Sequence, residues 1–205
     1  MIKNSFFLAC LLGLSSFVFG QEENKSKFGY GINFGVGNST LENNQLGNLS
    51  GNILALKFNI DYSISKEDNT KIISGIEFID FNSSFFNGVN QSKLKNEYLQ
   101  IPLKLTHRIS LNENDKLSLV TGIGTYANFL LRSNITSLSN KINTKSGGVN
   151  FGYNILLGME YSLSQNSTLI LNSDIMNEIS AIKRNGYEQK QSEILLLSIG
   201  FVTKF

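Results

Sequence analysis

Cysteine, histidine and proline are almost absent from this 205-residue chain, each occurring once. The cysteine, Cys10, lies in an apolar leading segment that we expect to be removed, which would leave no thiol for disulfides, metal binding or catalysis. The histidine, His107, has no surrounding residues in the spacing of a Ser-His-Asp triad or a histidine metal site. Neither catalysis nor a metal centre is indicated, and we expect His107 to lie at a membrane interface.

Charge of one sign and long apolar runs are scarce as well. The formal net charge is +2, and lysines and arginines do not cluster with aromatic residues, so nucleic acid is not an expected partner. The mean hydropathy of −0.05 argues against a helical membrane protein. A membrane β-barrel has such an average, because only alternate residues of its strands face lipid.

The first twenty residues have the order of a secretory signal peptide. Lys3 is followed by an apolar segment at 6–18, and the small residue Gly20 precedes an expected cleavage site before Gln21. A membrane helix is disfavoured by the segment's length, and lipidation at Cys10 is disfavoured by the residues before it. We therefore expect residues 1–20 to be a signal peptide and residues 21–205 to be the mature domain.

Residues 96–109 show the pattern that dominates the mature chain. Apolar residues occupy the odd positions, with His107 as the one polar exception, and mainly polar residues occupy the even positions. Side chains of a strand alternate between its faces, so one face is apolar and the other polar. About 9–11 tilted residues cross a bilayer as a strand, and this segment is longer than that. The length favours a membrane wall.

Eight such segments follow one another with connections that alternate between long and short. The expected strands are 27–37, 53–64, 71–81, 96–109, 117–132, 148–164, 168–176 and 192–205, and the long loops are 38–52, 82–95, 133–147 and 177–191. The parity of 71–81 is blurred by Ile73, Ile79 and Phe81. This layout predicts an all-β, eight-stranded antiparallel up-and-down transmembrane β-barrel in the outer membrane, with short periplasmic turns and longer external loops.

Aromatic residues fall near both ends of the expected strands, as membrane girdles require. The periplasmic girdle is expected to comprise Phe28, Tyr62, Tyr161 and Phe205. A soluble barrel of the lipocalin type is the alternative, with its apolar face turned inward. The glycine, asparagine and serine of the polar face favour a sealed polar interior instead.

The segment Tyr98-Leu99-Gln100-Ile101-Pro102-Leu103 resembles the Y-L-x-I-P-L motif of the PorT-like outer-membrane β-barrel proteins of the Bacteroidetes. The strand and loop layout is similar over the whole mature chain, although many relatives have glutamate where this chain has Gln100. The resemblance implies a small barrel without an agreed activity, and it makes a secretion accessory one specific possibility. It also implies that the C-terminal strand, ending at Phe205, is recognised by the barrel-assembly machinery.

Eight strands leave an interior that side chains can fill. The inward charges are expected to form a paired lumen network of Lys57, Asp61, Glu77, Lys104, Arg108, Glu160 and Asp174, together with Lys204. Asp61, Glu77 and Lys104 are expected at similar depth. A proton or ion path through these residues is the functional alternative, whereas a glycosidase carboxylate pair would lack a cleft.

Pro102 cannot donate to a β-ladder, so we expect a β-bulge or one lost hydrogen bond there, near the upper rim. For function, the sequence favours a non-enzymatic structural or interaction protein whose external loops bind an envelope or secretion partner. The alternative is a narrow pore for small solutes or lipid. Outer-membrane lipid is an expected partner, and no cofactor is expected.

Overall fold

The computed structural model describes residues 27–65, 68–86, 90–137, 141–144, 147–184 and 187–204. The expected signal peptide, Cys10 and Phe205 lie outside these ranges. The strands are β1 (Phe28–Asn43), β2 (Gly47–Ser63), β3 (Thr70–Phe86), β4 (Gln91–Ser110), β5 (Leu117–Ser137), β6 (Lys141–Thr144), β7 (Val149–Ser162), β8 (Ser167–Glu178), β9 (Ile182–Arg184) and β10 (Tyr187–Lys204). Within the described ranges, no helix has the length and apolar character that crossing a membrane would need.

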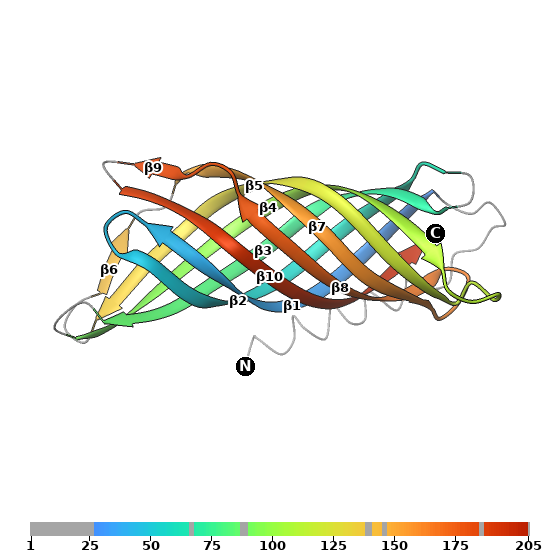
Figure 1. Cartoon of the computed structure of the whole chain (residues 1–205), viewed down its shortest axis with the longest axis horizontal. Helices are drawn as coiled ribbons and strands as arrows, with labels where there is room; N and C mark the ends of the chain where they lie inside the picture. The colour runs from blue at the N-terminus through green and yellow to red at the C-terminus, as the bar shows by residue number, and fades with distance from the viewer. Residues whose placement is uncertain are drawn as a thin grey trace, which may run out of the picture.

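Eight long strands form a closed antiparallel ring in the order β1-β2-β3-β4-β5-β7-β8-β10 (Figure 1). The ring closes where β1 pairs with β10, in a register that runs from Gly29 opposite Lys204 to Asn43 opposite Gln189. The short strands β6 and β9 extend the sheet at one end, beside β5 and β10. The predicted fold class is confirmed. We call the end that carries β6 and β9 the far end, and the opposite end, where β1 starts, the near end.

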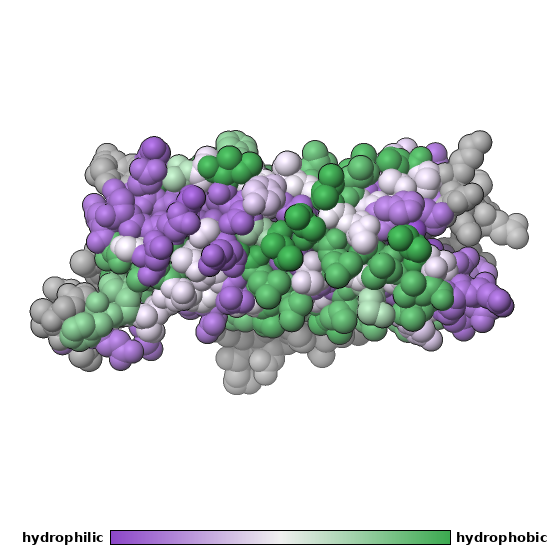
Figure 2. Space-filling model, in the orientation of Figure 1, coloured by the Kyte–Doolittle hydropathy of each residue, from purple (hydrophilic) through white to green (hydrophobic). Residues whose placement is uncertain are grey.

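Strict alternation explains why β7 is a strand of this wall. Its even-numbered side chains from Asn150 to Glu160 are buried, and its odd-numbered side chains from Val149 to Tyr161 are exposed. A period of two with glycines on the inner face suits a curved sheet whose outer face meets an apolar medium. Figure 2 shows apolar side chains gathered over the middle of the visible wall and hydrophilic ones toward both ends.

The strands continue well past the expected rim, so the prediction of four long loops is wrong over most of their length. Between β1 and β2, residues 44–46 alone are outside the strands. The Asn43 side chain caps this turn, its Oδ1 accepting hydrogen bonds from the backbone N–H groups of Gln45 and Leu46, both at 2.9 Å. Gly47 then adopts a φ of +76°, which glycine tolerates without steric cost.

The far half of the interior contains an apolar core beside buried polar side chains such as Asn96, Gln191 and Glu178, which differs from the polar interior expected throughout. Fourteen buried residues from the strands of the wall and from β9 form this core: Leu41, Leu49, Ile53, Ala55, Ile79, Phe81, Leu94, Tyr98, Tyr126, Leu130, Met176, Ile182, Ile194 and Leu196. Several come from segments that were assigned to loops, such as Leu41 and Leu94. The far half therefore has a hydrophobic core like that of a soluble barrel.

Pro102 interrupts the ladder between β3 and β4, but it does so in the middle of β4 and without a bulge there. Ser74 pairs with Leu103 and Glu77 with Gln100 in one register, while Gly75 and Ile76 have no partner in β4. The Ser74 hydroxyl donates to the Pro102 carbonyl oxygen at 2.8 Å and so satisfies that acceptor. The ladder is interrupted at Pro102 as expected, but the expected position of Pro102 near the upper rim is wrong. The register shift of β4 lies elsewhere, between Glu97 and Tyr98 against β5.

Candidate functional site

Four charged side chains from four strands meet inside the barrel, and we call them the central cluster: Lys57 on β2, Glu77 on β3, Lys104 on β4 and Asp174 on β8. Lys57 Nζ lies 2.6 Å from Asp174 Oδ2, and Lys104 Nζ lies 3.1 Å from Asp174 Oδ1. Lys104 Nζ also lies 3.4 Å from Glu77 Oε1. Two cations thus face two anions, and the cluster is formally neutral.

Side-chain amides complete the central cluster. Gln100 Nε2 donates to Glu77 Oε2 at 2.9 Å, and Asn154 Nδ2 donates to Asp174 Oδ1 at 2.6 Å. Glu77 and Asp174 are both 0% exposed. Buried charges are tolerated when they are paired and when their remaining lone pairs are hydrogen-bonded, as they are here. The cluster therefore links β2, β3 and β4 to β8 across the lumen.

A second group of charges lies closer to the near end. Lys71 Nζ is 3.8 Å from Glu160 Oε1, and Arg108 Nε is 3.6 Å from Glu160 Oε2. Asp61 is buried and interacts electrostatically with Lys71 and Glu160, not with the central cluster. The expectation that Asp61 shares the depth of Glu77 is therefore wrong. In β2, Lys57 is the residue opposite Glu77, and Asp61 lies four residues farther toward the near end.

Lys204, the last inward charge expected from the sequence, lies at the near-end turn between β2 and β3. Its ammonium donates to the Asp68 carboxylate, which also accepts from the Ser63 hydroxyl. Partial burial favours the neutral carboxyl, but these hydrogen bonds and the nearby Lys71 outweigh it and lower the pKa of Asp68. This contact holds the end of β10 against the turn.

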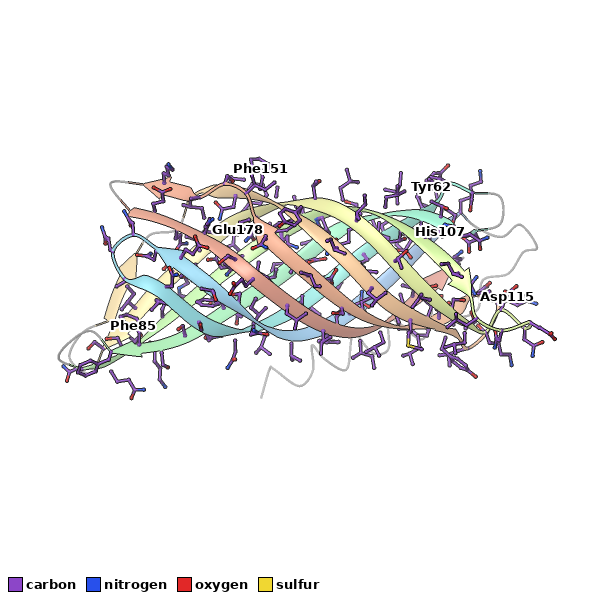
Figure 3. The ribbon with its side chains drawn as sticks, in the orientation of Figure 1. Tyr62, Phe85, His107, Asp115, Phe151 and Glu178 are labelled. Atoms are coloured by element: carbon purple, nitrogen blue, oxygen red, sulfur yellow. The ribbon has the colours of Figure 1, made fainter. Side chains whose placement is uncertain are left out.

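Glu178 is an inward charge that sequence reasoning missed, because it fell in the expected loop 177–191. Its carboxylate accepts hydrogen bonds from Asn128 Nδ2 at 2.7 Å, from Asn150 Nδ2 at 2.5 Å and from the backbone N–H of Gln191 at 2.5 Å. Figure 3 shows Glu178 within the barrel, toward the far end. Lys71 was also left out of the network, because it lies at the start of its strand. Both residues are in phase with the inward-facing residues of their strands, and this alternation could have identified them.

The outer wall carries aromatic residues of the expected periplasmic girdle at its near end. At the near end, the rings of Phe28 and Tyr62 lie 5.0 Å apart with an interplanar angle of 49°, and Tyr161 is exposed on β7. His107 lies at the same end as Tyr62 (Figure 3), exposed, with its Nδ1 3.1 Å from the Thr70 hydroxyl. Beyond the apolar band, at the far end, exposed ion pairs replace apolar side chains.

One of these exposed ion-pair groups joins β3 and β4. Lys95 Nζ lies 3.0 Å from Asp80 Oδ2 and 2.9 Å from Glu97 Oε1. Its hydrogen bonds to Glu97 and Asp80 raise the pKa of Lys95 above its ordinary value. Among the described residues, no three or more histidine, cysteine or carboxylate side chains are grouped so that they could hold a metal ion.

A closed antiparallel ring with an apolar outer band, aromatic residues at the near end and paired charges in its lumen defines a class, the outer-membrane β-barrel proteins. Solved structures of that class share this fold. Neisserial surface protein A is 15% identical, covers 89% of this chain and 100% of its own, and gives a TM-score of 0.55. A major outer membrane protein from Thermus thermophilus is 12% identical, covers 87% and 99%, and gives a TM-score of 0.52.

Neither a family model nor a curated protein matches this chain. The structural likeness is one of fold. The closed ring with a band of exposed apolar side chains places the protein in the outer membrane. The first strand starts and the last strand ends at the near end, and the strands extend well past the apolar band at the far end. The near end is then periplasmic, and the far end is extracellular.

Proposed function

We propose that this protein is a non-enzymatic, non-conducting barrel that anchors its extracellular end as a binding surface for an envelope or secretion partner. The observation that carries the proposal is the central cluster, whose side chains cross the lumen between the adjacent strands β2, β3 and β4 and the opposite strand β8. An ion passing through would have to separate buried ion pairs, and doing so in a low-dielectric interior costs several kcal/mol.

The interior beyond the central cluster supports the same conclusion. A solute from outside would have to pass the far half, where Phe81 and Leu196 of the apolar core and the hydrogen-bonded Glu178 carboxylate are buried. Small eight-stranded barrels are generally filled by side chains in this way. A barrel with a filled interior offers no path for solutes, so functional contacts would be made by its outer surface and its extracellular tips.

The extracellular tips carry apolar residues that a simple spacer would not need. Phe86 and Ile179 are 69% and 71% exposed at the ends of β3 and β8, whereas Phe85 packs against the apolar core. These two side chains come from β3 and β8, on opposite sides of the ring, and we propose them as contact points for the partner. A secretion accessory of the PorT type is a specific version of this role, and its support is the sequence resemblance of residues 98–105.

Planar-bilayer recordings test the proposal. The purified protein should give no steady conductance, and a variant in which Lys57, Glu77, Lys104 and Asp174 are all replaced by alanine should give more open events than the parent. Steady wild-type channels that central-cluster substitutions change would instead support the alternative, a narrow pore. In intact cells, a photocrosslinker at Phe86 should capture one defined partner, and one at the periplasmic His107 should not capture it.

A further inference from the structure

A row of outward polar residues crosses four strands beyond the apolar band. In the β-ladders Asn38 of β1 is opposite Asn52 of β2, Asn52 is opposite Asn82 of β3, and Asn82 is opposite Lys95 of β4. Side chains of paired residues project to the same face of a sheet. Three amides and one ammonium therefore stand side by side on the outer wall, in the extracellular half.

This row lines a shallow hollow of about 740 Å³. Its other outward lining residues are hydroxyl-bearing or cationic: Ser50, Ser84, Lys93 and Thr136. Lys93 is exposed, and no carboxylate of the described residues lies within ion-pair distance of its ammonium. The hollow thus combines neutral hydrogen-bonding groups with a cation that is available to an external anion.

A second hollow, of about 430 Å³, lies directly toward the membrane on the same strands. It is lined mainly by apolar side chains, which include Phe34, Val36, Leu54 and Phe78, and also by Asp80, which is paired with Lys95. Val36 and Leu54 are each two residues from the asparagines of the row, Asn38 and Asn52, on the same face of their strands. An apolar hollow therefore continues into a polar, cationic one across the level at which the hydrocarbon ends.

We propose that the two hollows together bind a phosphorylated glycolipid of the outer leaflet. Its acyl chain would lie against Phe34 and Leu54, its sugar hydroxyls against the asparagine row, and its phosphate beside Lys93, because Lys95 is already paired with Asp80 and Glu97. The amphiphilic order of the hollows, apolar below and polar above, matches a lipid standing in the bilayer. A protein partner would have no need of an apolar surface at hydrocarbon depth. Ammonium groups near an anionic lipid surface attract it by charge, which selects for phosphate.

Native mass spectrometry in detergent micelles can measure this binding with two probes, a bis-phosphorylated lipid A and the same glycolipid without phosphates. Lys93→Gln should weaken binding of the phosphorylated probe about 5-fold, from the usual contribution of one lysine near an anionic lipid. Lys93→Arg should restore binding. The phosphate-free probe should bind all variants alike.

Lys183→Gln is the matched control, because Lys183 is an exposed lysine of the same extracellular end that pairs with Glu188 at 3.2 Å. It should leave both affinities unchanged. The proposal is overturned if Lys183→Gln weakens binding as much as Lys93→Gln, since attraction would then be general. It is also overturned if Lys93→Gln has no effect, or if it weakens both probes equally. SDS gel electrophoresis of unheated samples, in which folded barrels migrate apart from unfolded chains, confirms that each variant is folded.

Discussion

Replacing Asp174 with asparagine should destabilise the barrel far more than its small change in volume suggests. The carboxylate is fully buried and is the partner of two ammonium groups, at 2.6 Å from Lys57 and 3.1 Å from Lys104. After Asp174→Asn, Lys104 keeps Glu77, whereas Lys57 has no other carboxylate among its described ion pairs. A buried cation is then left uncompensated.

The expected size follows from that uncompensated charge. Removing one partner of a buried ion pair costs about 3–5 kcal/mol of unfolding free energy, whereas replacing both partners by apolar groups of similar size is often close to neutral. Asp174→Asn should therefore cost about 3–5 kcal/mol. Adding Lys57→Met, which returns the cluster to neutrality, should bring stability back to within about 1–2 kcal/mol of the parent. Lys95→Gln, which breaks two exposed ion pairs, with Asp80 and Glu97, should cost about 0–1 kcal/mol.

Urea titration in phospholipid vesicles can measure all four proteins. The chain has no tryptophan, so unfolding is best followed by circular dichroism and by SDS gel electrophoresis of unheated samples, in which folded and unfolded protein migrate as separate bands. The reasoning would be refuted by a loss below about 1 kcal/mol for Asp174→Asn, because the charges would then be solvated or rearranged. It would also be refuted if Lys57→Met failed to rescue Asp174→Asn.

Two further predictions concern the backbone and the near-end turn. Gly75 has a φ of +149°, and an added Cβ would lie 2.0 Å from the Phe58 carbonyl oxygen. Gly75→Ala should therefore cost about 3 kcal/mol of unfolding free energy in the same titration. Gly47→Ala is the control and should cost about 1 kcal/mol, because φ is positive there but no atom lies near the added Cβ. Equal losses would mean that the clash is relieved. The lowered pKa of Asp68 means that its contribution to stability is present above about pH 4 and is lost as pH falls through the folded-state value. Wild-type stability minus that of Asp68→Asn should therefore shrink below about pH 4, and a constant difference would contradict this.

The sequence predicted the part of the barrel that lies in the membrane and failed beyond it. The alternation of 148–164 and 96–109 placed nearly every side chain of β7 and of the membrane part of β4 on the correct face. In residues 38–52 the same period of two is present, with Leu41 and Leu49 buried, but polar residues occupy both faces. Composition then indicated a loop, although the backbone continues as two paired strands.

The sequence predicted which charged side chains face the lumen, but not which of them contact one another. Lys57, Glu77, Lys104 and Asp174 could be assigned to the lumen from parity alone, because each lies within a clearly alternating segment or pairs with one. Their contacts depend on the shear of the ring, which brings β2, β3, β4 and β8 to one level and which no single strand encodes. Depth therefore could not be inferred, and Asp61 was placed with the wrong partners.

The blurred parity of 71–81 has a physical cause that applies to the whole wall. In β3 the apolar side chains change from outward at Ile76 and Phe78 to inward at Ile79 and Phe81. In hydrocarbon an apolar residue gains nothing by turning inward, whereas in water burial of apolar surface is the main drive to fold.

Each strand should therefore invert its pattern where the bilayer ends, and β2 does so as well, from Leu54 outward to Ile53 inward. Across from Leu54 in the register lies Asp80, the first outward charge of β3. The inversion marks the outer boundary of the hydrocarbon from the sequence itself, and that boundary coincides with the junction between the apolar and the polar hollow.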